Sequence, residues 1–473
     1  MNTNPIRTLI TVCTATAMLM LDIAVINSAL PNVAADLGGG LDGVQWVVDA
    51  YTLALAATVL TAGSLADRYG RRGTFVLGLI VFTVSSLACA LAQSMPQLDA
   101  ARAVQGVGAS AMFATSLALL GSAYPDWASR SKALAAYGAT IGGSFAIGPL
   151  AGGVLTDWFG WRAVFLVNLP IGVFCLVGAV KMLESRDPAA RRPDWLGQVF
   201  GGGSLFLLIL ALVRGNMAGW TSTLVVGSFI GAGACLVAFL VAERTVREPM
   251  LPLDLFRSRT FTGLQIAAFA ISASLFAIFL YVTIYLQSIL GLSPIQAGLV
   301  YMPATFLSFV MAASTGSLLK RVSAKTLLVG GLALVTLGMA VSLIVDEQSS
   351  WWIVLPGQII GLIGTGLFNP VVSGLVLSEA RPGQEALAVG INDAARQTGI
   401  AVGVALLGAF IPVSAAMGSN GAAEYVHGLH NAIWLGVAIA AVGAVASAVL
   451  IRPRSPGEQT ADAQAEVAEP ALA

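Results

Sequence analysis

The chain is a succession of long apolar runs separated by short polar segments. A membrane-spanning helix needs about 20 predominantly apolar residues, and fourteen such runs occur along the 473 residues. Pro, Gly or clustered charges interrupt nearly every gap, as is typical of loops. The pattern predicts an all-α polytopic membrane protein with fourteen transmembrane helices, near 8–30, 46–64, 74–93, 98–122, 133–155, 162–182, 195–213, 222–242, 260–288, 296–318, 326–344, 352–378, 384–412 and 430–451.

The basic residues indicate how these spans are oriented. If the N-terminus is cytoplasmic, 20 of the 24 Lys and Arg residues fall in cytoplasmic segments. The other four are Arg102 and Arg396 within spans, and Arg162 and Arg214 at external span ends. The positive-inside rule therefore predicts fourteen spans with both termini in the cytoplasm. The first run is too long for a signal peptide, so we expect it to be retained.

The composition agrees with a lipid environment and excludes several kinds of function. Hydrophobic residues make up 57% of the chain and charged residues 10%, whereas soluble domains are about one quarter charged. The 24 basic and 24 acidic residues balance, so no basic face is available for nucleic acid. The four cysteines all lie in apolar runs, which indicates core packing rather than disulfides or metal binding.

Patterns for catalysis or metal binding are weak. No nucleophile–base set, metal-ligand cluster or phosphate-binding loop stands out along the chain. His427 and His430 form an H-x-x-H pattern, but two histidines without a further ligand are a weak zinc signal. We therefore expect no enzyme activity, no metal site and no cofactor.

A charged turn follows the second predicted span, and a similar turn follows the tenth. The segment Gly63-Ser-Leu-Ala-Asp-Arg-Tyr-Gly-Arg-Arg72 is echoed by Gly316-Ser-Leu-Leu-Lys-Arg-Val-Ser-Ala-Lys325, which begins 253 residues later. This repeat predicts two related six-helix bundles, at 1–185 and 256–452, with a two-helix insertion and its cytoplasmic linkers at 186–255. The acidic, Ala-rich segment 453–473 is expected to be a disordered cytoplasmic tail.

Three ionisable side chains are expected inside the membrane. Asp22 lies in the first span, Asp49 in the second and Arg102 in the fourth, all within roughly 8 Å of one depth at the 1.5 Å rise of a helix. An intramembrane charge costs about 2.5–3.5 kcal/mol on insertion scales, so each needs a reason. Asp22 and Arg102 either form a structural ion pair or take part in proton coupling; Asp49 is as easily a solvated or anchoring residue beside the interface.

Other polar residues within the spans are candidates for a substrate cavity. Apolar pockets with a few polar groups suit amphipathic ligands. The candidates are Asn27, Gln105, Tyr281, Tyr285, Gln287, Phe368 and Asn369. Asp393 and Arg396 lie three residues apart in the thirteenth span, where pairing along one helix is the simpler interpretation.

Four motifs resemble those of the major facilitator superfamily, in the order that the family has them. The Gly63–Arg72 turn resembles its loop 2–3 signature, and Leu98-x3-Arg102-x2-Gln105-Gly106-x-Gly108 resembles its helix-4 motif of proton-coupled exporters. Gly148-Pro149-x2-Gly152-Gly153 resembles the antiporter motif of helix 5, although Ser144 stands where that motif opens with Gly. Leu21-Asp22-x3-Ile26-Asn27-x-Ala29-Leu30-Pro31 resembles the helix-1 motif of the fourteen-span drug:proton antiporter branch, with Ala24 in place of Thr.

The resemblance implies roles for these residues. It implies two six-helix bundles that rock around a central cavity by alternating access, with Asp22 and Arg102 in proton coupling. The glycines of the fifth span would pack tightly against a neighbour. Asp67 would be the centre of a cytoplasmic gate that includes Gly63, Arg68, Gly70, Arg71 and Arg72, and it would face the positive end of a second-half helix, the thirteenth span.

We therefore expect a multidrug efflux protein of the cytoplasmic membrane that confers antibiotic resistance. It would be a proton-coupled antiporter exporting amphipathic organic compounds, cationic or neutral in charge. The alternative is a dedicated exporter of one physiological solute, such as a lipid, a siderophore or a self-made antibiotic. The expected partners are protons, small amphipathic organic substrates and membrane lipid, with no nucleic acid, and the expected state is a monomer.

Overall fold

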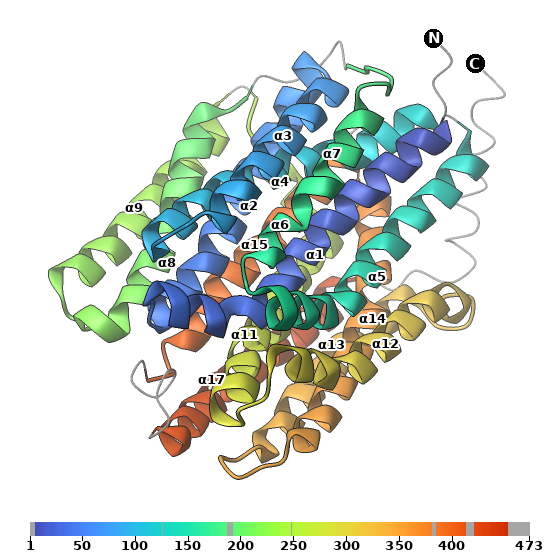
Figure 1. Ribbon diagram of the computed structural model, residues 1–473. Coiled ribbons are helices and arrows are strands. Elements are labelled where there is room, and N and C mark those ends of the chain that lie inside the picture. Colours follow the sequence, from blue (N-terminus) through green and yellow to red (C-terminus); the bar gives the residue numbers. More distant parts are fainter. Residues whose placement is uncertain are drawn as a thin grey trace.

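The computed structural model describes residues 5–124, 126–186, 193–246, 248–380, 385–412 and 421–452. Helices account for nearly all of these residues, and no β-strand occurs among them. The helices form two groups, blue to teal and yellow to red in Figure 1, with a green pair at one edge. The part of the chain that the structure describes is thus all-helical, as predicted; the expected disordered tail, 453–473, lies outside it.

The first group contains five long helices, of which the first and fifth have an internal proline, and two shorter ones. A glycine at φ +129°, Gly70, separates the second helix from the third, and the Asp126 side chain caps the fifth by accepting from the amide of Ser129. These helices are α1 (Pro5–Leu37), α2 (Leu41–Tyr69), α3 (Arg71–Ala90), α4 (Met95–Ala123), α5 (Trp127–Phe159), α6 (Ala163–Leu166) and α7 (Asn168–Ala179).

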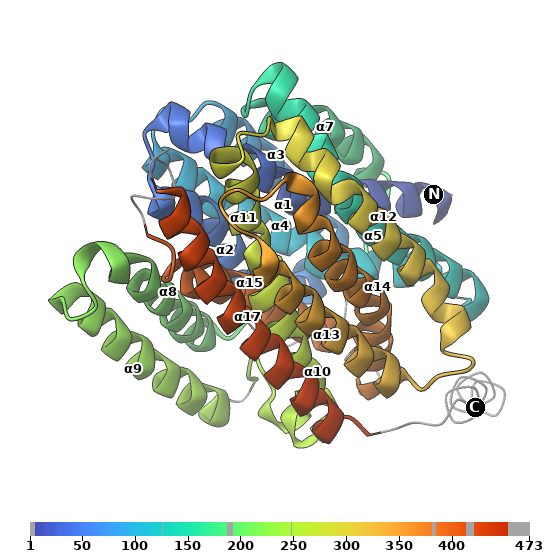
Figure 2. The ribbon, with the colours of Figure 1, turned by 90° about the horizontal axis from the view of Figure 1, so that it is seen from below.

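Two helices lie between the groups in sequence and at the edge in space. α8 (Trp195–Ala218) and α9 (Thr223–Thr245) begin at the side-chain caps Asp194 and Ser222 and pack against each other. α8 contacts α2 and α15, and α9 lies at the edge of the molecule (Figure 2). Apolar side chains of α9 such as Val237 are exposed. This arrangement is typical of a pair that faces lipid on its outer side.

The second group repeats the antiparallel pattern of long helices. Its first long helical segment contains two π-helical turns, η2 (Ser272–Phe276) and η3 (Tyr285–Ile289), a feature that often marks functional positions. The remaining elements are η1 (Leu253–Arg257), α10 (Arg259–Ile271), α11 (Ala277–Ile284), α12 (Pro294–Leu318), α13 (Ala324–Val341), η4 (Ser342–Ile344), η5 (Trp351–Ile353), α14 (Val354–Glu379), α15 (Glu385–Gly408) and α17 (Ala422–Leu450).

Eleven helical segments among the described residues are long and apolar enough to cross a membrane. The count becomes twelve if the pair 147–159 and 163–179, bent by 119°, is one span. α15 is not among the eleven. A count based on the length and hydropathy of the described helices is therefore lower than the fourteen spans that the sequence predicts.

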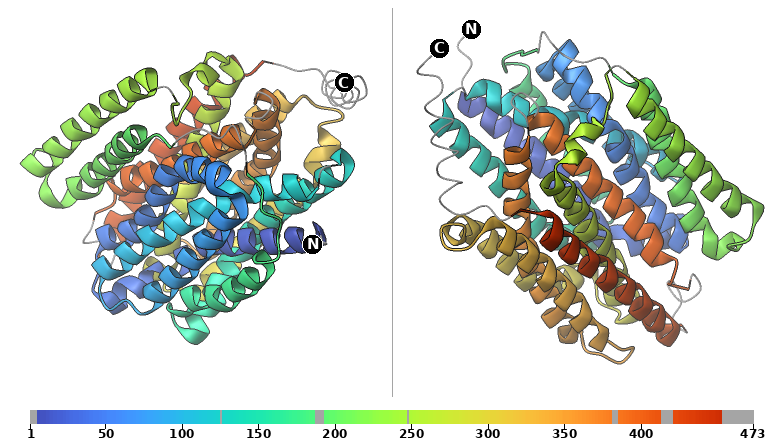
Figure 3. Two further views of the ribbon diagram at one scale, coloured as in Figure 1. Left: turned by 90° about the horizontal axis from the view of Figure 1, so that it is seen from above. Right: turned by 180° about the vertical axis from the view of Figure 1, so that it is seen from behind.

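Two faces of the molecule are used below as reference. α1 begins and α17 ends on one side, here called the Pro5 face, and α1 ends and α17 begins on the other, the Leu37 face (Figure 3). The two groups meet along two helix pairs, α5 with α12 and α2 with α15. Because all four helices cross between the faces, both pairs border the space between the groups.

Candidate functional site

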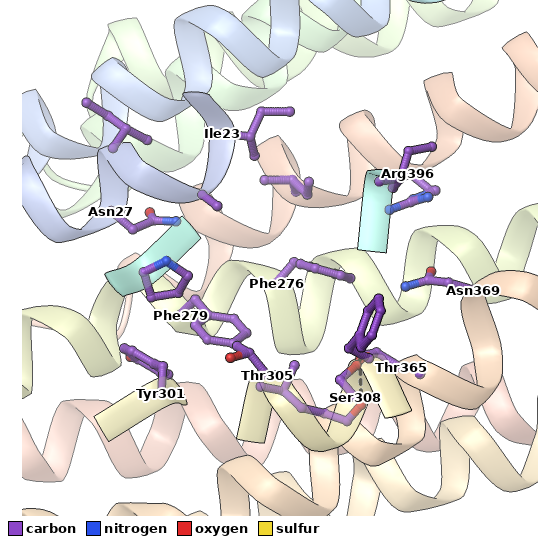
Figure 4. Close-up of a pocket in the computed structure, with 18 of the residues that line it drawn as sticks. Ile23, Asn27, Phe276, Phe279, Tyr301, Thr305, Ser308, Thr365, Asn369 and Arg396 are labelled. Atoms are coloured by element: carbon purple, nitrogen blue, oxygen red, sulfur yellow. Dashed lines mark hydrogen bonds between the residues drawn. The ribbon is translucent and has the colours of Figure 1, made fainter. Parts of the chain in front are cut away.

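A cavity of about 590 Å³ lies between the two groups. Its wall is largely apolar, with Phe276 and Ile400 among the lining residues, and it carries a few polar groups (Figure 4). The lining extends toward the Pro5 face: Ser373 lies six residues before the end of α14, about 9 Å of helical rise. Its size and mixed wall suit one drug-sized amphipathic molecule.

A buried ion pair borders this cavity from the first group. Nη1 of Arg102 on α4 lies 2.6 Å from Oδ2 of Asp22 on α1, and the two residues are 1% and 2% exposed. Arg102 and Tyr51 line the cavity, whereas Asp22 lies behind them. The acid predicted to change charge is therefore separated from the cavity by the arginine with which it pairs.

Amide groups complete the surroundings of Asp22. Its Oδ1 atom accepts from Gln105 Nε2 at 3.0 Å and from Asn168 Nδ2 at 2.8 Å. Both amides also donate to the hydroxyl of Ser86, at 3.1 and 2.9 Å, and that hydroxyl donates to the Phe165 carbonyl. Asp22, Ser86, Arg102, Gln105 and Asn168 are called the Asp22 network below. All three groups that reach Asp22 are donors, so the network is built around a carboxylate acceptor.

The arginine of this network is also held from its other sides. Arg102 Nε donates to the Val47 carbonyl at 3.1 Å, and Nη1 donates to Gln105 Oε1 at 2.7 Å. Its guanidinium carbon lies 4.2 Å from the centre of the Tyr51 ring, a cation–π distance. A change in the charge of Asp22 would therefore alter an arginine that contacts α2, α4 and the cavity wall together.

Asp49 occupies a different kind of environment. It is fully buried on α2, and neither of its carboxylate oxygens has a hydrogen-bond partner among the described residues. The position is thus not solvated, which was one of the alternatives that the sequence left open. Since an unpaired carboxylate in an apolar interior is costly, the cheapest form of such a side chain is the neutral acid.

The two groups are joined by hydrogen bonds at the Leu37 face. Gln45 Nε2 donates to Tyr281 Oη at 2.9 Å, Gln287 Nε2 to the Ser28 carbonyl at 2.9 Å, and Ser293 Oγ to Asp157 at 3.4 Å. Between described residues of 5–186 and 256–452, these are the hydrogen bonds present, and no ion pair joins the two ranges. The molecule is therefore closed at the Leu37 face, with the cavity extending toward the Pro5 face.

Glycines allow the backbones to meet at this closure. A Cβ atom on Gly153 would lie 2.5 Å from the Pro294 carbonyl oxygen, and one on Gly298 would lie 2.4 Å from that of Pro149. Gly148 and Gly152 meet α1 in the same way, at Ala24 and Val25. The motif of α5 thus packs against both α1 and α12. The resemblance implied tight packing against one neighbour.

The charged turn after α2 lies within the first group. Arg71 Nε lies 2.9 Å from Asp67 Oδ1, and the Glu184 carboxylate accepts from the amides of Arg72 and Gly73 at the start of α3. No described residue of the second group pairs with Asp67. The role of this turn as a gate therefore stays a prediction, and Glu184, which the sequence analysis did not single out, joins the turn to the segment after α7.

The structure distributes the predicted cavity residues over three places. Asn27 and Asn369 line the cavity, and Gln105 belongs to the Asp22 network. Tyr281 and Gln287 belong to the Leu37-face contacts, and Tyr281 Oη also donates to the Val404 carbonyl. The remaining two do not line the cavity: Tyr285 donates to the Asp346 carbonyl, and Phe368 is fully buried.

Asp393 and Arg396 do not form the predicted contact along α15. No ion pair or hydrogen bond between them is present, and Arg396 instead lines the cavity. Its side chain has no hydrogen-bond or ion-pair partner among the described residues. His430 of the H-x-x-H pattern bonds to the Val345 carbonyl at 2.7 Å.

Asn168 and Ser86 are functional candidates that the sequence analysis missed. Both are buried members of the Asp22 network, in which Asn168 donates to Asp22 and to Ser86. Asn168 is the one amide within the otherwise apolar 163–179 segment, and buried polar groups are costly unless paired. This cost could have identified Asn168 from the sequence, because a buried amide needs a hydrogen-bond partner inside the membrane.

Comparisons with known proteins agree with this architecture. A family model described as Major Facilitator Superfamily matches residues 12–404. The chain is 35% identical over 419 residues to the multidrug resistance protein Stp of Mycobacterium tuberculosis, covering 87% of this chain and 76% of that protein. It is 35% identical over 480 residues to the puromycin resistance protein pur8 of Streptomyces alboniger, covering 98% of this chain and 94% of that protein.

The fold also resembles solved transporter structures. The inward open conformation of the xylose transporter XylE from E. coli covers 96% of this chain, and 97% of that chain is matched, with a TM-score of 0.63. The sequence identity is 13%, so the likeness concerns the fold alone.

Proposed function

Because the chain belongs to the major facilitator superfamily, we propose that this membrane transporter is a proton-coupled antiporter that exports amphipathic organic compounds. The single observation that carries the proposal is the buried Asp22–Arg102 pair at the wall of the central cavity. Two relatives named for drug resistance support the export of toxic compounds. The cytoplasmic membrane is the proposed location.

We propose fourteen spans, with the Pro5 face in the cytoplasm. This count adds three spans to the eleven apolar segments: α5, α15 and the 163–179 segment formed by α6 and α7. The excess of Lys and Arg in the connections at the Pro5 face supports the orientation. The proposed units are the bundles 1–185 and 256–452 and the insertion 186–255, with a single chain as the transporting unit.

The proton step takes place at Asp22. A proton taken from the external side bonds to one carboxylate oxygen, and that oxygen then loses the hydrogen bond it accepted. The neutral acid no longer holds the charge of Arg102, so the guanidinium shifts its interactions toward Tyr51 and the cavity. Release of the proton on the cytoplasmic side restores the donor network described above.

Asp49 is a second position for a proton. Its two buried oxygens have no hydrogen-bond partner among the described residues, which is compatible with a neutral acid in the closed-outside state. Under this proposal Asp49 keeps its proton in this state, whereas Asp22 takes a proton when the external side opens and releases it when the cavity faces the cytoplasm.

Alternating access requires the Leu37-face contacts to break and the Pro5 face to close. The breaking contacts are those of Gln45, Gln287 and Ser293. In the closed-inside state we propose that Asp67 leaves Arg71 and faces the start of α15, where helix N–H groups favour a carboxylate.

Substrate-induced proton movement tests this function. Purified protein is placed in liposomes that contain a pH-sensitive dye, and chemically unrelated compounds, among them puromycin, fluorescein and rhodamine 123, are added one at a time. The proposal expects each transported compound to move protons in the direction opposite to its own. Transport with no proton movement contradicts antiport, and proton movement with one compound alone favours the dedicated exporter.

A further inference from the structure

The charged groups on the cavity wall all have the same sign. Two charged side chains, Arg102 and Arg396, are among the described residues that line it, and no Asp or Glu is. The charge of Arg102 is balanced by Asp22 at 2.6 Å. A cationic molecule in this cavity would meet two guanidinium groups and no carboxylate.

Arg396 has hydrogen-bonding capacity that the protein does not use. It donates no hydrogen bond and forms no ion pair with a described residue. The carboxyl of Asp393, one turn earlier on α15, acts on it through longer-range electrostatics and does not line the cavity. A guanidinium carries five N–H donors in a fixed plane that matches a carboxylate.

A second polar group without a partner faces the same space. Oδ1 of Asn369 on α14 is buried and accepts no hydrogen bond from a described residue, and the residue lines the cavity. In the view of Figure 4, Arg396 and Asn369 lie on one side of the cavity, with Thr365 and Ser308 below them. The other end of this amide is an NH₂ group with two N–H donors, and in Figure 4 its nitrogen points toward the middle of the view.

The rest of the wall defines the other end of the ligand. Phe276, Phe279 and Leu362 supply apolar and aromatic surface elsewhere on the wall. A ligand that satisfies both parts has an acidic group for Arg396 and Asn369 and a ring system for the aromatic wall. An acidic group would use the N–H donors of Arg396 that no described residue accepts, which favours such a ligand further.

We propose that the cavity binds amphipathic organic anions, with Arg396 as the residue that holds the acidic group and Asn369 as its neighbour. This deepens the export function proposed above and rests on it for the direction of transport. It replaces the cationic or neutral substrate that the sequence led us to expect. Carboxylates and acidic phenols attached to fused rings are the chemical class.

Two dyes with one ring skeleton and opposite charge test the proposal. Fluorescein carries a carboxylate, whereas rhodamine 123 is a cation, and binding of each to the purified full-length protein is measured by fluorescence anisotropy. We expect fluorescein to bind more tightly than rhodamine 123. The assay contains no pH gradient, so its result is independent of whether the protein is coupled to protons.

Variants locate the acidic group within the cavity. Arg396→Gln is expected to weaken fluorescein binding at least about tenfold, the effect of losing one charge-assisted hydrogen bond, without weakening rhodamine 123. Arg396→Lys should recover part of the loss, since it restores the charge without the planar fork. Arg214→Gln, which removes a half-exposed arginine at the Leu37 face, is the matched control and should bind fluorescein as the parent does.

The proposal is overturned if the parent protein shows no saturable binding of fluorescein, or binds rhodamine 123 at least as tightly. It is also overturned if Arg396→Gln leaves fluorescein affinity unchanged. Equal loss of both dyes in Arg396→Gln, with no recovery in Arg396→Lys, assigns Arg396 to the structure of the cavity and likewise overturns its role.

Discussion

Arg102 on α4 and Asp22 on α1 form an ion pair with 2.6 Å between Nη1 and Oδ2, and their side chains are 2% and 0% exposed. A buried pair of this kind is weak evidence for stability, because desolvation can offset the attraction. Arg102 also lines the cavity, which favours the proposed role in proton coupling over a purely stabilising one. The predictions below separate this use from a purely structural role.

Asn168 is expected to position the Asp22 carboxylate. Asn168→Leu removes a 2.8 Å donor to Oδ1 and a donor to Ser86, a loss of about 1.5–3 kcal/mol for a hydrogen bond to a charged group. Proton-driven transport in liposomes should fall tenfold or more, while ligand binding stays near that of the parent. Asn431→Leu, on the exposed side of α17, is the control, and an equal loss in both would contradict a positioning role.

Gly153 is expected to be required for closure at the Leu37 face. In Gly153→Val the new Cβ would lie 2.5 Å from the Pro294 carbonyl oxygen, so α5 and α12 must separate. Transport should be largely lost, and a cysteine introduced at Asn27, in a chain without its native cysteines, should react faster with an external maleimide. Gly143→Ala on the same helix meets nothing within 4 Å and should resemble the parent; unchanged labelling in Gly153→Val would refute the closure.

Tyr281 is expected to stabilise the closed-outside state. Tyr281→Phe removes the oxygen to which Gln45 donates, at a cost of about 1 kcal/mol, or a roughly fivefold population shift. Spin labels at Lys132 and Lys320, in the two groups near the Pro5 face, should report more of the short-distance state. Tyr285→Phe removes a hydrogen bond within the second group and should leave the distances unchanged; a shift of equal size there would argue against a specific contact.

Asp67 is expected to act when the Pro5 face closes. Since Asp67 pairs with Arg71 in the present state, Asp67→Asn should favour the state with that face open and slow transport without loss of the fold. The same spin-label pair would show fewer short distances. Asp254→Asn, which breaks an exposed pair with Arg257, is the control. More short distances in Asp67→Asn would contradict the proposed gate.

The sequence was most informative where a charge lies in an apolar run. Asp22 and Arg102 stand out because each is costly in lipid, and a common depth made their contact predictable. Asn168 and Ser86 did not stand out, because a single amide or hydroxyl in a membrane helix can face several neighbours. Their orientation depends on the bend between α5 and α7, which helical periodicity does not contain.

The cavity wall was less predictable for a related reason. Tyr281 and Gln287 are polar residues within helices, yet they join the two groups at the Leu37 face instead of lining the cavity. Which contacts form depends on the conformational state, and one sequence encodes both states. Arg396 was expected to pair with Asp393 along α15, but its long side chain lines the cavity. The three-residue spacing between the two allows either arrangement.

Proton-driven transport by Asp22→Asn, measured in liposomes with an imposed pH gradient, tests the central claim most directly. Asn keeps the size of the side chain but cannot exchange a proton. We predict that the gradient no longer accelerates transport in this variant, whereas it does in Asp36→Asn, which disrupts the half-exposed pair with Arg162 at the Leu37 face. Gradient-driven transport at the parent rate in Asp22→Asn would contradict the account and leave the Asp22–Arg102 pair a structural one.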